Sequence, residues 1–245
     1  MSTEPSLVRR AIVTGASGGI GQAIAERLAR DGAHVVVHAN TRLEAAEAIA
    51  GRIVADGGSA EAIAFDVTDR AAAQAACERL LAAGAIQIVV NNAGVHDDAA
   101  FPALRETQWQ RVIDVSLNGF FNVTQPLVMP MIRTRWGRIV NLSSVAAIAG
   151  NRGQVNYAAA KGALNSATKA LALELASRGI TVNAVAPGLI AAGMAAAIDP
   201  AVIERMVPMK RAGSAAEVAA LVAFLASDEA GYISGQVVSI NGAMI

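Results

Sequence analysis

The sequence predicts a single α/β domain in which a parallel sheet carries helices on both faces. Hydrophobic residues make up 54% of the 245 residues and charged residues only 16%, a balance that suits strands buried on both sides. Short apolar runs alternate with longer segments of helical periodicity along the whole chain. Because no linker, repeat or low-complexity segment interrupts this alternation, we expect one doubly wound domain over residues 1–245.

Seven short apolar runs are the expected strands of this sheet. The first runs into a Gly-rich turn at residues 15–21, and a helix with apolar Ile24 and Leu28 follows. The expected strands are residues 10–14, 33–37, 60–65, 86–90, 138–142, 180–186 and 236–240.

Glycines and capping residues mark the ends of several expected helices. The second helix ends at Gly57 and Gly58, the third is capped by Thr68 or Asp69, and the last begins at Ser214.

The remaining segments are expected to form a long helix, a second helix and a lid over the site. Residues 105–133 read as one helix that Pro126 and Pro130 bend near its end. The helix after the fifth strand ends at Gly179. We interpret residues 189–209, rich in Ala and Met, as small helices that form a lid.

Charge and cysteine content exclude several classes of protein. The net charge is +0, so nothing attracts nucleic acid or an anionic membrane globally. Cys77 is the only cysteine, and His34, His38 and His96 lack metal-ligand spacing. Residues 1–10 have no apolar signal-peptide core and no run of 18 apolar residues exists, so we expect a cytoplasmic protein without a metal site.

Three polar side chains are placed for chemistry at the carboxyl edge of the expected sheet, where open α/β sheets bind ligands. Ser144 follows the fifth strand, and Tyr157 and Lys161 lie four residues apart on one face of the next helix. A nearby ammonium lowers the pKa of a phenol from its usual value of about 10. We therefore expect Tyr157 to exchange a proton with a carbonyl that Ser144 orients. Taken alone, the Tyr–Lys spacing also fits an ordinary solvated helix pair.

The Gly-rich turn predicts a phosphate-binding site. Gly15, Gly19 and Gly21 permit a tight turn and let the backbone approach a pyrophosphate at a helix N-terminus. In dinucleotide-binding units an acidic residue near the end of the second strand binds the ribose 2′-hydroxyl. Here Ala39 stands at that point, and no carboxylate follows the strand until Glu44. Because the carboxylate that would repel a 2′-phosphate is missing, we expect NADPH to be preferred over NADH.

Five motifs occur in order and at fitting spacings: residues 14–21 (TGASGGIG), residues 91–94 (NNAG), Ser144, the Tyr157/Lys161 pair, and residues 187–188 (PG). On these motifs the chain resembles the short-chain dehydrogenase/reductases over nearly its whole length. The resemblance implies a Rossmann fold with Tyr157 as proton donor and acceptor. It also implies that Ser144 orients the carbonyl, and that Lys161 binds the nicotinamide ribose and tunes Tyr157.

The same resemblance implies the cofactor site. Asp66 and Val67 would meet the adenine, Asn92 the adenosine ribose side and Ile190 the nicotinamide carboxamide. The full expected set is Gly15, Ser17, Gly18, Gly19, Ile20, Gly21, Asn40, Arg42, Asp66, Val67, Asn92, Ala93, Gly94, Tyr157, Lys161, Pro187, Gly188 and Ile190.

Within the family, the chain is similar to the 3-oxoacyl-[acyl-carrier-protein] reductases in residues 150–161, 177–183 and 231–236. Residues 101–104, 125–131 and 208–211 further resemble the reductases that accompany aryl polyene synthesis. This implies NADPH-dependent reduction of a 3-oxoacyl thioester on acyl carrier protein by a homotetramer, with neither nucleic acid nor membrane as partner. Free ketones as substrates, or a non-catalytic dinucleotide sensor, are the alternatives.

Two positions depart from the family pattern. Ser116 occupies the slot where the family usually carries an Asn that completes a proton relay to the Lys, and Asn118 is two positions further on. Gly18 stands where many NADPH-using relatives carry Arg or Lys. Ser116 is therefore expected to make the proton relay less efficient, and Gly18 to make the preference for NADPH weaker.

Four arginines suggest a docking surface for the acidic carrier protein. Arg133, Arg135 and Arg138 cluster before the fifth strand, and Arg178 ends the helix of Tyr157. We expect them to converge near the mouth of the active site, although cations at helix C-termini are also ordinary.

Overall fold

A single parallel sheet organises the molecule. The computed structural model describes residues 8–192 and 199–245, and in them seven strands follow the order β3-β2-β1-β4-β5-β6-β7. Successive strands are added outwards from β1 on one side and from β4 on the other, while all strands stay parallel. This is the doubly wound arrangement that the alternation of strands and helices predicted. The strands are β1 (Arg10–Val13), β2 (His34–Ala39), β3 (Ser59–Ala64), β4 (Ile88–Asn91), β5 (Gly137–Leu142), β6 (Ile180–Pro187) and β7 (Val237–Ile240).

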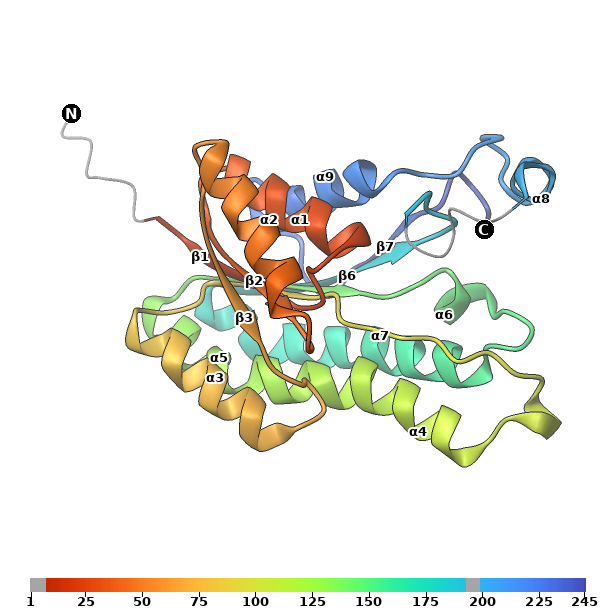
Figure 1. Cartoon of the computed structure of the whole chain (residues 1–245), viewed down its shortest axis with the longest axis horizontal. Coiled ribbons are helices and arrows are strands. Elements are labelled where there is room, and N and C mark those ends of the chain that lie inside the picture. The colour runs from red at the N-terminus through yellow and green to blue at the C-terminus, as the bar shows by residue number, and fades with distance from the viewer. Residues whose placement is uncertain (1–7, 193–198) are drawn as a thin grey trace.

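Helices cover both faces of the sheet (Figure 1). The first layer holds α1 (Gly19–Arg30), α2 (Leu43–Ala55) and α9 (Ala215–Ala226), and the opposite layer holds α3 (Arg70–Ala82), α4 (Glu106–Ile113), α5 (Gly119–Thr134) and α7 (Val155–Leu175). Each layer closes its own apolar core against the sheet, one around Ile24 and Val37 and the other around Ile12 and Leu127. Cys77 is fully buried in the second core. Short helices are η1 (Phe101–Ala103), α6 (Ala146–Ala149), η3 (Ala176–Arg178) and α8 (Pro200–Met206).

The expected long helix is present but contains a π-helical turn. Helices α4 and α5 are joined by η2 (Asp114–Asn118), whose i→i+5 geometry accommodates one extra residue. Pro126 and Pro130 lie inside α5, as expected. The apolar periodicity of the sequence gave no sign of the π-turn, because one added residue changes the helical phase without removing the apolar pattern.

The predicted helix ends are confirmed by their hydrogen bonds. Asp69, rather than Thr68, caps α3 by accepting from two backbone N–H groups of its first turn. Ser214 caps α9 in a reciprocal pair with Glu217. Gly179 adopts the left-handed conformation (φ 76°) that ends α7 and η3.

The segment expected to form a lid is described in part. Ile190 forms a β-bridge with Gly213, and α8 begins after Asp199, whose side chain caps it. The backbone N–H of Met209 then donates to Gly242 O near the C-terminus. Residues 193–198 lie outside the described residues, so the lid stays a prediction.

Among residues 8–192 and 199–245, no helix is long and apolar enough to cross a bilayer. Within the same residues, no group of three or more His, Cys, Asp and Glu side chains is arranged to hold a metal ion.

Candidate active site

The turns that follow β1, β4, β5 and β6 meet at the carboxyl edge of the sheet, on the right of the sheet in Figure 1. Two cavities open there, of about 410 and 290 Å³. They share Gly94 and Val95 as lining residues, and the Gly-rich turn contributes Ser17 to the larger and Ile20 to the smaller. The two cavities therefore form one elongated site beside the N-terminus of α1.

The Gly-rich turn is packed too closely for side chains at two of its glycines. A Cβ on Gly21 would lie 2.5 Å from both Asn92 Nδ2 and Gly15 O, and Gly15 has a positive φ of 63°. A Cβ on Gly18 or Gly19 would meet nothing within 4 Å. The turn thus leaves an open backbone surface, and no side chain caps the first N–H groups of α1. This combination suits a pyrophosphate.

Asn92 has a structural role that the sequence did not indicate. Its Nδ2 donates to Thr14 O at 2.8 Å and Gly15 O at 3.0 Å, while Thr14 Oγ1 accepts from the Asn92 and Ala93 backbone N–H groups. The side-chain amide of Asn92 thus joins the turn after β4 to the Gly-rich turn. Its expected contact with the adenosine ribose stays a prediction. Asn92 also lines the smaller cavity.

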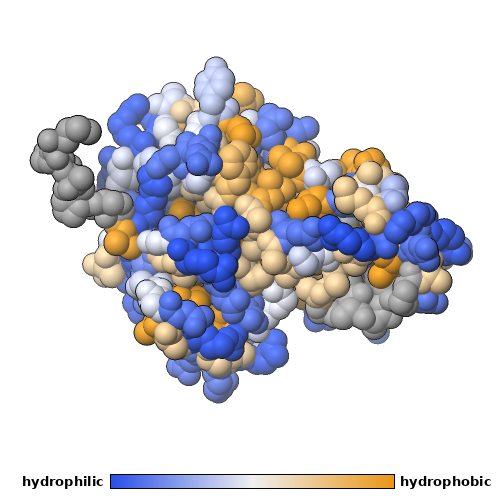
Figure 2. All heavy atoms as spheres, turned by 90° about the horizontal axis from the view of Figure 1, so that it is seen from above, coloured by the Kyte–Doolittle hydropathy of each residue, from blue (hydrophilic) through white to orange (hydrophobic). Residues whose placement is uncertain are grey.

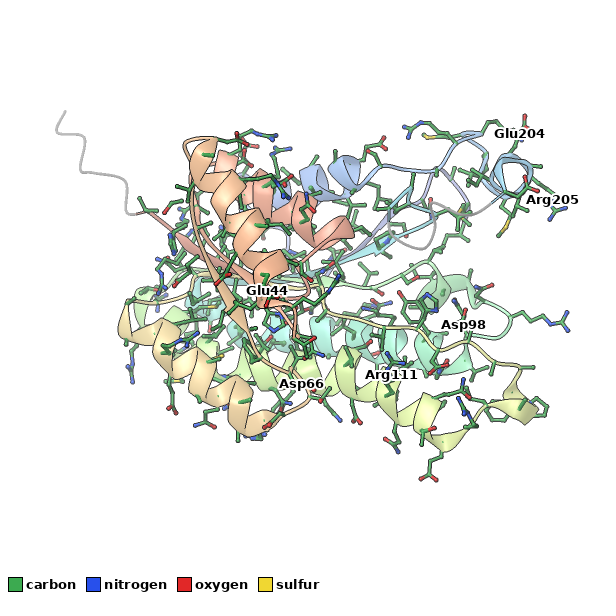
Figure 3. The ribbon with its side chains drawn as sticks, in the orientation of Figure 1. Glu44, Asp66, Asp98, Arg111, Glu204 and Arg205 are labelled. Atoms are coloured by element: carbon green, nitrogen blue, oxygen red, sulfur yellow. The ribbon has the colours of Figure 1, made fainter. Side chains whose placement is uncertain are left out.

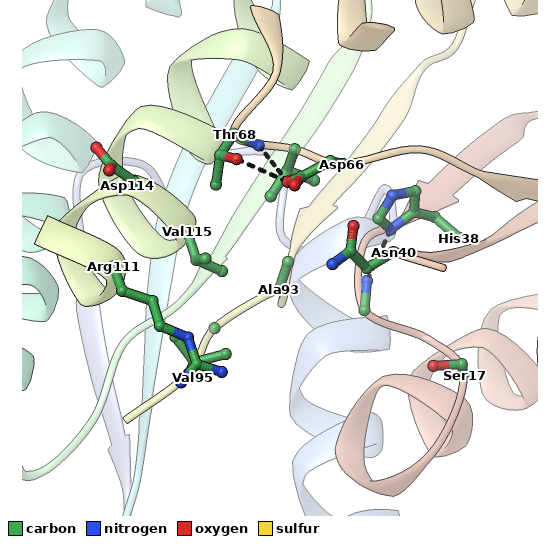
Figure 4. A pocket seen from close by; sticks show the side chains of 13 residues that line it. Ser17, His38, Asn40, Asp66, Thr68, Ala93, Val95, Arg111, Asp114 and Val115 are labelled. Atoms are coloured by element: carbon green, nitrogen blue, oxygen red, sulfur yellow. Dashed lines mark hydrogen bonds between the residues drawn. The ribbon is translucent and has the colours of Figure 1, made fainter. Parts of the chain in front are cut away.

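The larger cavity is lined by residues expected at the adenosine end of a dinucleotide (Figure 4). Ser17, Asn40, Asp66 and Val67 line it, as the family resemblance implied. Asp66 is oriented by Thr68, whose backbone N–H and Oγ1 both donate to Asp66 Oδ1 at 2.8 Å. The carboxylate is thereby fixed at the rim before any ligand binds.

His38 holds the walls of this cavity together. The backbone N–H of Gly15 donates to His38 Nδ1 at 3.1 Å, and His38 Nε2 lies 2.9 Å from Phe65 O. Since Nδ1 accepts, the proton is on Nε2 and the ring is neutral. Burial lowers the pKa of His38 from 6.5 to about 4, which keeps it neutral at physiological pH. The imidazole therefore joins the Gly-rich turn to the strand end that precedes Asp66.

The residues after β2 are placed differently from the expectation. The strand continues to Ala39, which is 1% exposed, whereas Asn40 is exposed and lines the cavity. Arg42 immediately precedes α2, is exposed, and does not line either cavity. Asn40, and not Arg42, is therefore the expected cofactor-binding residue after β2 that lines the larger cavity.

The smaller cavity brings Ser144, Tyr157 and Lys161 together. Ser144 begins the turn after β5 and its Oγ accepts the Ala146 N–H. Lys161 is 3% exposed, and its Nζ donates to Leu142 O at 2.6 Å. Pro187, Gly188 and Ile190 of the turn after β6 complete the wall, as expected. The Tyr–Lys pair is thus part of an active-site cavity and not a solvated helix pair.

Burial dominates the electrostatics of this cavity. Burial lowers the pKa of Lys161 from 10.5 to about 8. Burial also raises the pKa of Tyr157, although hydrogen bonding with Ser144 acts in the opposite direction. The Lys161 Nζ lies 5.8 Å from the centre of the Tyr157 ring. In the free protein the pKa of Tyr157 is therefore raised, chiefly by burial. The lowering expected from Lys161 together with an oxidised nicotinamide stays a prediction.

Ser116 lies in the π-helical turn. It is 3% exposed, and its Oγ has no hydrogen-bond partner within the described part of the chain. An unpartnered buried hydroxyl is uncommon. Its part in a proton relay stays a prediction.

The arginines proposed for carrier-protein docking do not reach this cavity within one chain. Arg135 and Arg178 precede β5 and β6, whereas Ser144 follows β5, so they lie at opposite edges of a parallel sheet. Arg138 is 4% exposed and donates to Ser227 O. The expected convergence near the mouth of the cavity is therefore wrong.

Several lining residues were missed from the sequence. In the larger cavity they are His38, Thr68, Val95, Arg111, Asp114 and Val115, and in the smaller Val95, His96, Leu142, Ser143 and Ala192. Gly18, Gly19 and Gly21, which were expected, line neither cavity but shape the turn between them. His96 carried a signal that was overlooked, since it follows the NNAG motif directly after a strand end.

Comparisons with known proteins agree with this geometry. The family model described as short chain dehydrogenase matches residues 9–202. The chain is 48% identical to the 3-oxoacyl-[acyl-carrier-protein] reductase FabG of Aggregatibacter actinomycetemcomitans, over 95% of this chain and 98% of that protein. It is 43% identical to the FabG reductase of Staphylococcus aureus, over 97% and 98%. It is also 42% identical to nodulation protein G of Azospirillum brasilense, over 96% and 97%.

Proposed function

Because the chain belongs to the short-chain dehydrogenase family, we propose that it reduces 3-oxoacyl-[acyl-carrier-protein] to the 3-hydroxyacyl form, with NADPH as the cofactor. The observation that carries the proposal is the convergence of Ser144, Tyr157 and Lys161 in one cavity beside an open Gly-rich turn. The names of two relatives over 40% identical along nearly their whole length support the substrate class.

The two connected cavities support a dinucleotide cofactor. Asp66 and Val67 would hold its adenine, the Gly15–Gly21 turn its pyrophosphate, and Lys161 its nicotinamide ribose. The bound nicotinamide supplies the hydride.

The chain's own residues direct the proton. Ser144 Oγ–H donates to the substrate carbonyl oxygen and orients it. The Tyr157 phenol donates its proton to the same oxygen as that oxygen gains negative charge. The Lys161 ammonium, buried and held by Leu142 O, stabilises the resulting tyrosinate. Because burial favours the neutral phenol, the free protein keeps Tyr157 protonated and ready to donate.

The preference for NADPH is supported by the residues after β2. Asn40 faces the adenosine cavity, Arg42 is exposed two residues further on, and no carboxylate stands between them. A 2′-phosphate would find hydrogen-bond donors and a cation there. Gly18 supplies no second cation, so the preference is modest.

A homotetramer is supported by exposed apolar side chains. Phe121 and Met129 on α5, and Val155 and Leu173 on α7, are 46%, 54%, 42% and 85% exposed. Figure 2 shows further apolar residues gathered on the face formed by α1, α2 and α9. Such surface is usually covered in an assembly. Light scattering that gives a species of 25.0 kDa at micromolar concentration would refute the tetramer.

One assay separates the proposed function from its alternatives. NADPH oxidation is measured with a 3-oxoacyl-acyl carrier protein, a small 3-oxoacyl thioester and a free ketone of equal length. The proposal predicts the highest kcat/KM for the carrier-bound substrate. Preference for the free ketone would favour a general ketone reductase, and binding of NADPH without turnover a sensor. A higher kcat/KM with conjugated acyl chains would support a similarity to the reductases that accompany aryl polyene synthesis.

A further inference from the structure

One titratable side chain in the catalytic cavity has no part in the proposed chemistry. His96 lies two residues after the NNAG motif and lines the cavity of about 290 Å³ together with Ser144 and Tyr157. Its ring stands edge-on to Tyr157, with ring centres 6.4 Å apart and planes at 83°. An imidazole this close to the reacting groups faces the same substrate.

His96 is held in place from the residues just before the helix that carries Tyr157. His96 Nδ1 lies 3.2 Å from Asp98 Oδ1, and Asp98 Oδ2 accepts from Gln154 Nε2 at 2.8 Å. The Ala99 N–H also donates to Gly153 O at 2.9 Å. Figure 3 shows Asp98 on the segment that passes beside the start of α7. The segment that carries His96 is therefore tied to the residues that immediately precede α7, the helix of Tyr157.

This anchoring leaves one ring nitrogen for a ligand. Asp98 engages Nδ1, and Nε2 of His96 has no hydrogen-bond partner among residues 8–192 and 199–245. When the ring carries both protons, Nδ1–H faces the Asp98 carboxylate and Nε2–H is a second donor. Such a ring offers a single N–H donor to an oxygen in the cavity.

A 3-oxoacyl thioester carries a second carbonyl oxygen two carbons from the one that is reduced. Resting on the proposed function, we propose that His96 is a substrate-binding residue whose Nε2–H donates to this thioester oxygen, and that Asp98 is its positioning residue. Ser144 and Tyr157 hold the 3-oxo oxygen while His96 holds the other. The enzyme thereby selects 1,3-dicarbonyl substrates over simple ketones.

The charges around His96 agree with this assignment. The titratable groups that face it are Asp98 on its own segment and Tyr157 and Lys161 on α7. Arg111 of α4 pairs instead with Asp97, at 3.6 Å. Burial and the nearby Asp98 charge both raise the pKa of Tyr157.

Three substitutions test the proposal, each assayed with a 3-oxobutanoyl thioester of N-acetylcysteamine and a simple ketone of equal length. His96→Phe should lower kcat/KM for the thioester by about 10- to 100-fold, as expected for a lost hydrogen bond to a charged donor. The value for the ketone should change by less than about threefold. His96→Gln keeps an N–H donor, so it should retain part of the thioester activity that His96→Phe loses.

Asp98→Asn tests the positioning role. It removes the carboxylate charge that His96 Nδ1 faces, so the kcat/KM for the thioester should fall, while the kcat/KM for the ketone should change by less than about threefold. The matched control is His34→Phe, which changes another histidine beside a carboxylate, Glu61 at 3.2 Å, at the opposite edge of the sheet. This control variant should have the same kcat/KM as the wild type for both substrates. Unfolding temperatures and NADPH dissociation constants report whether each variant is folded.

Two results would overturn the proposal. A folded His96→Phe enzyme that loses both activities equally, or neither, would show that His96 does not contact the thioester oxygen. A wild-type enzyme that reduces the ketone but not the thioester would instead refute the proposed function, and the selection with it.

Discussion

The hydrogen bonds of His38 predict a measurable, pH-dependent contribution to stability. The perturbation is His38→Leu, which approximately preserves the buried volume but removes both ring nitrogens. Gly15 N–H and Phe65 O then lose their partners. An unsatisfied buried polar group costs about 1–3 kcal/mol. Because Gly15 N–H is only partly buried, we expect the variant to lose about 2–4 kcal/mol of unfolding free energy at pH 7.

The stability difference between the wild type and His38→Leu is expected to depend on pH. Burial lowers the pKa of His38 to about 4 in the folded protein, while an unfolded histidine titrates near 6.5. Between these values the unfolded chain binds more protons, so wild-type stability falls as the pH falls from 6.5 to 4. The shift corresponds to about 3 kcal/mol. The leucine variant lacks this contribution, so the difference between the two proteins should shrink towards pH 4.

Urea unfolding at several pH values, followed by circular dichroism, measures both effects. The variant should also bind NADPH about tenfold more weakly, since the Gly-rich turn loses an anchor worth about one hydrogen bond. His34→Leu is the matched control. Equal stabilities at pH 7 for wild type and His38→Leu, or parallel pH curves, would refute the reasoning.

Three further substitutions test the site. Tyr157→Phe keeps the ring but removes the transferable proton, so kcat should fall by about 10²–10⁴-fold with NADPH binding unchanged; activity within threefold of wild type would contradict the assignment. Asn40→Asp places a carboxylate beside the adenosine cavity, so the kcat/KM ratio of NADPH to NADH should fall below one; an unchanged ratio would be evidence against the 2′-phosphate position. Gly21→Ala forces a Cβ to within 2.5 Å of Asn92 Nδ2 and Gly15 O and should cost about 1–3 kcal/mol of stability, which thermal unfolding measures.

Much of the fold was predictable because its signals are local. Strand–helix alternation, the Gly-rich turn and the capping residues Asp69 and Ser214 each depend on a few neighbouring residues, and all are present. Ser144, Tyr157 and Lys161 were also predictable, since their spacings place them at one sheet edge. What these predictions share is that they need no knowledge of which strands are neighbours.

What the sequence did not reveal needed tertiary information. The bridge made by His38 depends on the alignment of three strands, and the raised pKa of Tyr157 depends on burial that only the fold supplies. The docking interpretation failed for a related reason. Arg135 is only nine residues from Ser144, but one strand lies between them, and a strand carries the chain to the opposite edge. Sequence proximity therefore misled where strand direction decides.

The extra residue in the π-helical turn rotates α5 about its own axis relative to α4. One helical residue turns the chain by about 100°, so the turn at Asp114–Asn118 sets which side of α5 faces the sheet. On that side Asn122 Nδ2 holds Val67 O at 2.9 Å, and Thr124 Oγ1 accepts from Asn91 Nδ2. Deleting a single residue of the turn would restore regular α-helical bonding locally, yet rotate both side chains away from their partners. The irregularity that weakens the helix by itself thus helps to fix the backbone at Val67, which lines the larger cavity and lies 55 residues earlier in the chain than Asn122.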